Sequence, residues 1–404
     1  LDDWEQRKSH EIFQTITDYV ANGSFASLRE NVSYSKKKDF AIVVRLTDYS
    51  NKYKGPFLYT SELGYKFLKK SSLVKGDILI SNVGANAGLV YRAPNMDVPM
   101  TLGPNSILVR SDGNDTEFLY QMMKTTYGEK KIKEQIGISA QPKFNKTEFR
   151  QIDFFLPSND EQKQIGTMFS QLDKTIALHQ RMSDKQKNLK ANLLQMMFPR
   201  NGEKIPEVRL AGFVEDWSQR TLEDISDKVT EKNKAREFTE TLTNSAEYGI
   251  ISQSDYFDKD ISNINNINGY YVVRPDDFVY NPRISNFAPV GPIKRNNLNR
   301  IGIMSPLYYV FRPKRVDHTF LEKYFETSYW HIFMKMNGDS GARADRFAIK
   351  DTILKEMPIP YPIMEEQVKI GIFFNQLDKS IVLHQEKIAH LKVLKSTLLN
   401  KMFI

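Results

Sequence analysis

The chain has 404 residues, of which 40% are apolar and 12% aromatic, with a net charge of +8 and no cysteine. This length favours two or three domains with cores of their own, and the lack of cysteine excludes disulfides and thiolate metal sites and favours a reducing cytoplasm. No run approaches 18 uninterrupted apolar residues, no basic-then-apolar leader opens the sequence, and the six histidines show no compact ligand spacing. We therefore expect a soluble cytoplasmic protein that binds no metal.

The sequence predicts two stretches of short strands, each followed by a helical stretch. Strand-like runs at 39–46, 77–83 and 105–111 precede a helical stretch at 117–135, and runs at 269–275 and 307–313 precede another at 319–336. We interpret each stretch as an α+β module with a curved mixed sheet and a few helices.

The two modules differ in charge. Residues 29–150 contain 20 Lys and Arg against 12 Asp and Glu, whereas residues 220–355 contain 20 against 18. On charge alone, the first module is therefore typical of a polyanion-binding domain and the second is not.

One segment of the chain occurs twice, at an offset of 205 residues. Residues 161–198 align without a gap with residues 366–403 and share 20 identities in 38 positions, including the runs QLDK and LHQ. A second, shorter repeat lies at the start of each half, where DWEQR from Asp3 matches DWSQR from Asp216. The order along the chain is therefore module, helix, divergent module, and the same helix again.

Both copies of the repeat carry apolar residues at alternating steps of four and three, which is the pattern of a heptad seam. His179 and His384 occupy equivalent seam positions, and we interpret them as packed polar residues that fix the helix register. A helix of 38 residues is about 57 Å long, and its apolar stripe needs a partner, for which its own copy is the obvious choice. The predicted seam residues are Ile165, Phe169, Leu172, Ile176, Leu193, Ile370, Phe374, Leu377, Ile381, Ile388, Leu391 and Leu398.

Chain order predicts how the two long helices pair. The second helix leaves the second module, so it starts near the point where the first helix stopped and must run back for the seams to meet. We therefore expect an antiparallel coiled coil with one module at each end and an approximate two-fold axis relating them.

Three catalytic motifs of enzymes that act on DNA are absent from the sequence. The nearest run to an amino-methyltransferase NPPY is Asn281-Pro282-Arg283-Ile284, which lacks the second proline and the aromatic residue. Pro275-Asp276 is not followed downstream by the acidic-x-Lys triplet of a restriction-type nuclease, and no Gly-Lys dipeptide supplies a phosphate-binding loop. The sequence therefore predicts a chain without a catalytic site.

The repeated helices, with QLDK followed by I-x-LHQ and a closing LL-x-x-MF, resemble those of the specificity subunits of type I restriction–modification systems. The lead-in VRLAGF–EDWSQR before the second module is similar to the inter-module boundary of the same family, and the resemblance covers essentially the whole chain. The sequence departs from the family's pattern ahead of Trp4, where the lead-in that precedes Trp217 has no counterpart.

The resemblance implies that each module is a target-recognition domain that reads one half of an asymmetric bipartite DNA site, while the helices set the spacing. It implies double-stranded DNA, two modification subunits and restriction subunits as partners, which would bring S-adenosylmethionine, Mg²⁺ and ATP, so that this chain binds no cofactor itself. The implied boundaries are 1–157 and 200–360 for the recognition domains, the latter with the linker, and 158–199 and 361–404 for the helices. The alternative is a coiled-coil scaffold that binds protein and has no DNA role.

Candidate DNA contacts lie in the loops of both modules. Asparagine suits adenine edges, arginine suits guanine, and the backbone of small residues suits phosphate, although a solvated lysine run or plain turns remain the alternatives. In the first module the candidates are Lys36, Lys37, Lys38, Ser81, Asn82, Asn86, Arg92, Gln141 and Lys143; in the second they are Asn281, Arg283, Ser285, Asn286, Ser340, Arg343 and Arg346.

Overall fold

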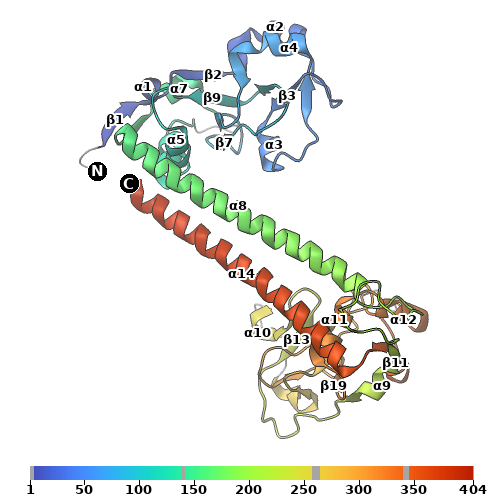
Figure 1. The fold of residues 1–404 in the computed structure, drawn as a ribbon. Helices are drawn as coiled ribbons and strands as arrows, with labels where there is room; N and C mark the ends of the chain where they lie inside the picture. Colours follow the sequence, from blue (N-terminus) through green and yellow to red (C-terminus); the bar gives the residue numbers. More distant parts are fainter. Residues whose placement is uncertain (1–3, 138–141, 257–263, 340–344, 404) are drawn as a thin grey trace. The chain divides into compact units, whose positions relative to one another are not determined.

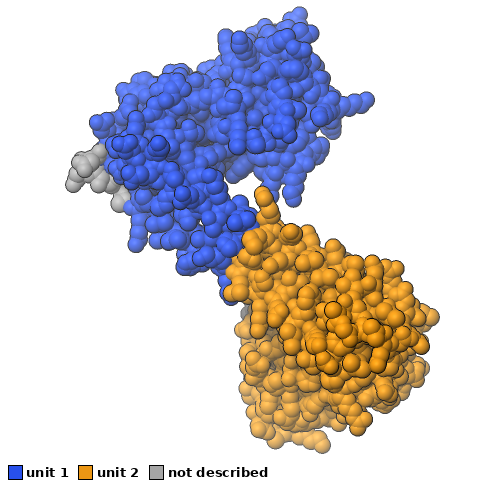
Figure 2. Space-filling model, viewed as in Figure 1, with its two compact units in different colours: residues 1–180, 386–404 blue, residues 181–385 orange. Residues whose placement is uncertain are grey.

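The computed structural model describes residues 4–137, 142–256, 264–339 and 345–403. The chain divides into two compact units, residues 1–180 with 386–404 (unit 1) and residues 181–385 (unit 2), coloured separately in Figure 2. Each unit contains one module together with parts of both long helices (Figure 1). The α+β class and the two long helices are as the sequence predicts.

The module of unit 1 is built on a four-stranded antiparallel sheet in the order β2-β9-β6-β7. A second four-stranded sheet, β4-β3-β8-β5, contains the parallel pair β3–β8 and is therefore mixed. The strands are β1 (Glu5–Lys8), β2 (Thr15–Asp18), β3 (Ala41–Val44), β4 (Leu58–Thr60), β5 (Ser72–Leu73), β6 (Ile78–Ser81), β7 (Val90–Arg92), β8 (Met100–Leu102), β9 (Ser106–Arg110) and β10 (Asp153–Leu156). The helices are α1 (Ser9–Ile12), η1 (Tyr19–Asn22), α2 (Phe25–Asn31), α3 (Leu46–Ser50), α4 (Glu62–Phe67), η2 (Lys69–Ser71), α5 (Thr116–Met123), α6 (Thr126–Lys133) and α7 (Lys146–Arg150).

The module of unit 2 repeats the first sheet, with strand order β12-β19-β16-β17, but lacks a second four-stranded sheet among the residues described. Two-stranded pairs, β13–β14 and β15–β18, are found instead. The strands are β11 (Ser218–Thr221), β12 (Ser226–Lys228), β13 (Leu242–Ser245), β14 (Gly249–Ser252), β15 (Tyr271–Val273), β16 (Phe278–Tyr280), β17 (Ile293–Arg295), β18 (Gly302–Met304), β19 (Tyr309–Pro313) and β20 (Pro358–Tyr361). The helices are α9 (Leu222–Ile225), α10 (Gln253–Tyr256), η3 (Ile264–Gly269), α11 (His318–Glu326), α12 (Trp330–Asn337) and α13 (Asp351–Leu354).

The central strands of both modules are buried on both faces. In β6, Ile78 and Ile80 belong to one apolar cluster and Leu79 to another, and in β16 Phe278 and Val279 likewise face different clusters. A strand covered on both sides has no polar face, which explains why these runs read as continuous apolar stretches rather than as an alternation.

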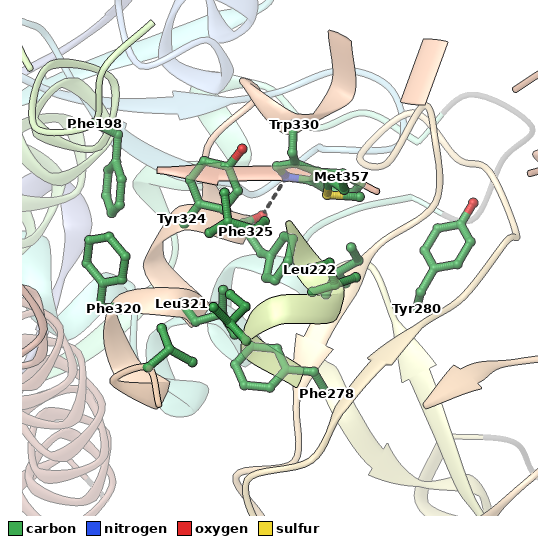
Figure 3. Close-up of a cluster of buried hydrophobic side chains, with 14 of the residues drawn as sticks. Phe198, Leu222, Phe278, Tyr280, Phe320, Leu321, Tyr324, Phe325, Trp330 and Met357 are labelled. Atoms are coloured by element: carbon green, nitrogen blue, oxygen red, sulfur yellow. Dashed lines mark hydrogen bonds between the residues drawn. The ribbon is translucent and has the colours of Figure 1, made fainter. Parts of the chain in front are cut away.

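The aromatic core of unit 2 gathers around α11 (Figure 3). Phe320 lies 5.3 Å from Phe198 between ring centroids, and the Trp330 indole N–H donates to the carbonyl of Phe325. The predicted helical stretch 319–336 forms two helices, α11 and α12. The stretch 117–135 likewise forms two helices, α5 and α6. In unit 1 the break is the cap of α6, where the Thr125 hydroxyl accepts from the Gly128 N–H at 3.0 Å.

The long helices α8 (Asn159–Met196) and α14 (Met364–Met402) pack together in antiparallel fashion, as the chain order predicts. In unit 1, Lys395 Nζ on α14 lies 2.6 Å from Asp173 on α8; in unit 2, Lys190 Nζ on α8 lies 2.6 Å from Asp378 on α14. The partners of the second pair are the equivalents of those of the first at the 205-residue offset of the repeat, so each unit contains the same interhelical ion pair.

Every predicted seam residue is buried or half-buried. The first copy is more polar than the second, however, because Ser183 and Gln186 occupy the positions of Ile388 and Leu391. Gln186 donates to the Ser380 hydroxyl at 2.8 Å, and Ser183 is fully buried. Polar groups in a seam fix register at some cost in stability.

The short DWEQR/DWSQR repeat at the start of each half forms an equivalent strand in each module. EQRK of the first half forms β1 and pairs with β10, and SQRT of the second forms β11 and pairs with β20. Each two-stranded sheet therefore joins the first strand of a module to the strand that leads into the long helix following that module.

Candidate nucleic-acid interface

In unit 2, the loop that follows β16 lies against the much later segment that leads into α13. Both segments carry predicted DNA contacts, and we call residues 281–288 and 345–348 the second loop pair. Its backbone contacts are an antiparallel bridge between Arg283 and Arg346, the Phe347 N–H donating to the Pro282 carbonyl at 2.7 Å, and the Ile284 N–H donating to the Asp345 carbonyl at 3.0 Å. Two segments that were predicted separately thus form one surface.

Unit 1 has the same arrangement after β6, and we call residues 82–88 and 142–145 the first loop pair. Asn82, Val83, Lys143 and Phe144 here take the places of Pro282, Arg283, Arg346 and Phe347. The backbone contacts are a bridge between Val83 and Lys143, the Phe144 N–H donating to the Asn82 carbonyl at 3.1 Å, and the Gly84 N–H donating to the Pro142 carbonyl at 2.8 Å. The modules therefore present different side chains on the same backbone frame.

The basic side chains of both loop pairs are available to an anion. Arg283 and Lys143 are exposed and Arg346 is half-exposed, and no acidic side chain among the described residues pairs with them. Unpaired cations on a protein surface suit phosphate, and arginine also suits the guanine edge. Asn86, Ser285 and Asn286 are exposed at the loop tips, and their contact with DNA stays a prediction.

Three predicted contacts are engaged within the protein instead. Ser81 ends β6 and is 2% exposed. Asn281 donates from its carboxamide to the Asn244 carbonyl at 2.8 Å and accepts from the Arg283 N–H at 3.0 Å, so it shapes the loop. The Arg92 guanidinium lies 2.7 Å from Glu117 and stacks over Tyr120. These internal contacts do not test the prediction, and a role of the three residues in DNA contact stays a prediction.

The remaining predicted residues fall outside the loop pairs as described. Lys36, Lys37 and Lys38 are exposed ahead of β3. Gln141, Ser340 and Arg343 lie outside the described residues. For all six, a role in DNA contact stays a prediction.

A cavity of about 680 Å³ with a mixed polar and apolar lining lies beside the second loop pair, lined in part by Arg283 and Arg346 and by the buried polar strand β13. The Asn244 amide donates to the carbonyls of Val279 and Pro292 at 2.7 and 3.2 Å, which fixes its orientation. Its Oδ1 is buried and has no donor among the described residues. The amino-acid sequence does not indicate this strand, because Asn is disfavoured in strands and both Asn and Ser are typical of turns.

The second loop ends in a tightly packed turn. Burial raises the pKa of Tyr280, so its hydroxyl stays protonated and donates to the Val290 carbonyl at 3.0 Å. Gly291 follows with φ +82°, and a Cβ there would lie 2.1 Å from the Asn281 carbonyl oxygen. Only glycine fits this approach of backbone to backbone.

Gly291→Ala is therefore expected to displace the loop and to destabilise it by more than the 1–2 kcal/mol or so that a left-handed alanine costs alone. Gly249 is the matched control, since its φ is +74° and no atom lies within 4 Å of the added Cβ. Hydrogen exchange of residues 278–293 measures the difference. Equal protection in the two variants would show that the close contact is absorbed without displacement.

The described residues hold no group of three or more His, Cys, Asp or Glu side chains placed to bind a metal ion. Nor does any helix within the described ranges have the length and apolar character needed to cross a membrane. What the two modules share is a pair of cationic, amide-bearing loops on a common frame, which defines a recognition protein of two modules joined through a helix pair.

Comparison with known proteins agrees with this class. The chain matches the model of the family described as "Type I restriction modification DNA specificity domain" over residues 2–187 and 214–393, and it belongs to that family. It is a DNA specificity subunit of a type I restriction–modification system, a non-catalytic part of that complex, and in this family the cofactors reside on the modification and restriction subunits.

Individual relatives resemble the chain along most of its length. The MjaVIII specificity subunit of Methanocaldococcus jannaschii is 22% identical over 364 residues, covering 85% of this chain and 84% of that protein. The putative MjaX specificity subunit of the same organism is 23% identical over 425 residues, covering 99% and 92%. The crystal structure of a type I S subunit from M. genitalium shares the fold, with a TM-score of 0.56 and 14% identity over 100% of this chain and 96% of that one.

Proposed function

We propose that each loop pair reads one half of an asymmetric bipartite DNA site. The observation that carries this proposal is the matched backbone frame of the two loop pairs, which carries Asn82, Val83 and Lys143 in one module and Pro282, Arg283 and Arg346 in the other; of the Asn82 side chain, the amide oxygen is buried. Equivalent frames suit equivalent tasks on DNA, and unlike side chains imply unlike base sequences.

The test is Arg283→Ala in the assembled complex with its modification subunits. We expect affinity to fall by about 1–3 kcal/mol at the base pair concerned and specificity to relax in the second half-site alone, because the guanidinium serves only that module. Binding-site selection on the variant complex measures both half-sites in one experiment.

Arg274→Ala is the matched control, since that arginine belongs to the same unit but pairs with Glu231 at 2.9 Å. It should leave both half-sites unchanged. An equal loss at both half-sites in Arg283→Ala would contradict the assignment of one half-site to each module.

We further propose that the helices hold the half-sites apart and dock two modification subunits, with restriction subunits completing the complex in the cytoplasm. Major-groove faces recur about every 34–36 Å, so a rod of about 57 Å is long enough to seat two readers. Exposed apolar side chains on helix surfaces indicate a protein partner. On these helices they are Leu178, Met182, Leu189, Met364, Val368, Ile372, Val382, Leu383, Val393 and Leu394.

On this proposal the recognition domains are residues 1–157 and 200–360, and the spacer helices are residues 158–199 and 361–404. The two compact units divide the chain differently, because each contains parts of both helices. Domains defined by function and units defined by packing need not coincide in a chain whose helices serve both modules.

A further inference from the structure

Two large apolar side chains are exposed beside the cationic groups of the second loop pair. Phe287 is 77% exposed and Leu307 is 60% exposed, and both line the cavity that Arg283 and Arg346 also line. Phe287 comes from the second loop pair and Leu307 from the loop between β18 and β19. Because the two side chains line the same cavity as two cations, they are candidates for contact with a ligand that carries both charge and an apolar group.

Backbone hydrogen bonds hold Phe287 at the tip of its loop. Ser285 and Ala288 exchange both backbone hydrogen bonds, at 3.0 and 3.1 Å, so Asn286 and Phe287 form a two-residue turn. Ala288 is 5% exposed and anchors the end of the turn in the protein. The aromatic ring is therefore presented outward by a fixed backbone.

The surroundings of the ring select its partner. Two guanidinium groups without acidic partners among the described residues favour a polyanion, and the aromatic and leucine side chains require an apolar group on that polyanion. In the major groove of DNA, the only apolar group on a base edge is the C5-methyl of thymine.

We propose that Phe287, assisted by Leu307, contacts a thymine C5-methyl group in the second half-site and thereby specifies an A·T pair there. This inference rests on the proposed reading of one half-site by each loop pair. It adds an apolar contact to the hydrogen-bonding residues that the sequence indicates.

The first loop pair supplies an internal contrast. Its tip is Ala85-Asn86-Ala87, which has no side chain larger than asparagine. The small side chains at this tip include no large apolar group that could contact a thymine methyl group. The first half-site should therefore be insensitive to the removal of thymine methyl groups at the position equivalent to that under Phe287.

The experiment uses the assembled complex with its modification subunits and DNA bearing the selected site. Each thymine of the second half-site is replaced in turn by uracil, which removes only the methyl group. We expect one replacement to lower affinity about threefold to fivefold, the effect of withdrawing one buried methyl group. Phe287→Ala should lose affinity for thymine DNA and abolish the difference between thymine and uracil, whereas Phe287→Leu should retain part of it.

Ile332→Ala is the control, because this isoleucine is 47% exposed in the same unit but does not line the cavity. It should leave the thymine-to-uracil difference intact. The inference is overturned if no replacement in the second half-site lowers affinity, if that half-site contains no A·T pair, or if Phe287→Ala keeps the full difference. Failure of the proposed function looks different, since the complex would then bind DNA without sequence preference.

Discussion

Asp378→Asn is expected to destabilise unit 2 by about 3 kcal/mol, because it leaves two lysines to share one carboxylate. Lys323, whose side chain is 5% exposed, lies 2.7 Å from Asp378 and 2.5 Å from Glu326. Lys190 lies 2.6 Å from Asp378 and 2.8 Å from Glu326. The effect falls at the lower end of the range for a broken buried pair because Asp378 keeps 32% of its side chain exposed.

Unit 1 provides the matched control at the equivalent position of the repeat. Asp173 pairs with Lys395 and accepts from the neutral Gln121 at 2.9 Å, and its side chain is 42% exposed. Asp173→Asn therefore leaves only Lys395, which is partly exposed, without its carboxylate partner. It should lower the free energy of unfolding of unit 1 by about 1 kcal/mol or less. Hydrogen exchange of α11 in one variant and of α5 in the other measures the two costs separately. Equal costs would contradict the view that the buried Lys323 sets the difference.

The same group gives unit 2 an acid-sensitive stability. Burial alone would raise the pKa of Asp378, but hydrogen bonds from Lys190 and Lys323 outweigh it and hold the pKa below its ordinary value. A lowered folded-state pKa contributes stability that is complete above the ordinary aspartate pKa of about 4 and is lost as the pH falls through the lowered value. Asp378→Asn should flatten this acid limb of the stability curve.

The repeat allowed the helix pair to be predicted because its signal is local. The spacing of apolar residues along one segment is enough to predict a heptad seam. The identity of the two copies then indicates which helix each one packs against. The bounds differ only at the ends, with α8 at Asn159–Met196 against the expected 158–199. Helix ends depend on capping and fraying, so spacing alone fixes them less well.

The loop pairs were predicted only in part, because their formation is not local. The residues around Arg283 and Arg346 were each identified by composition, but no periodicity links segments so far apart in sequence. The internal contacts of the predicted residues were hidden from the sequence for the same reason. Arg92 is engaged by Glu117 from another element, and Asn281 by the backbone of Asn244. Ser81 differs, since the inward burial of β6 continues to its last residue.

Phe374→Ala is expected to cost unit 2 about 3–5 kcal/mol, the usual range for removing a buried aromatic ring. Phe374 is fully buried in the cluster that also contains Phe320, Leu321 and Ile370, so the loss opens a cavity where α14 meets the module. Hydrogen exchange of residues 318–337 and of the first half of α14 measures the cost. Its neighbour Phe373, partly buried and 5.3 Å away between ring centroids, is the matched control and should cost less.

Phe374→Ala should also affect assembly with a modification subunit, because α14 has one buried and one exposed apolar face. One face holds Phe374 and Ile370 in the module core, and the other exposes Val368 and Ile372, which we propose face a modification subunit. Loosening the core face should therefore weaken assembly without touching the docking residues, and light scattering of the mixed subunits measures it. Full assembly with Phe374→Ala, together with lost protection in α14, would mean that the modification subunit reorders the helix itself, and docking energy would then stabilise the fold.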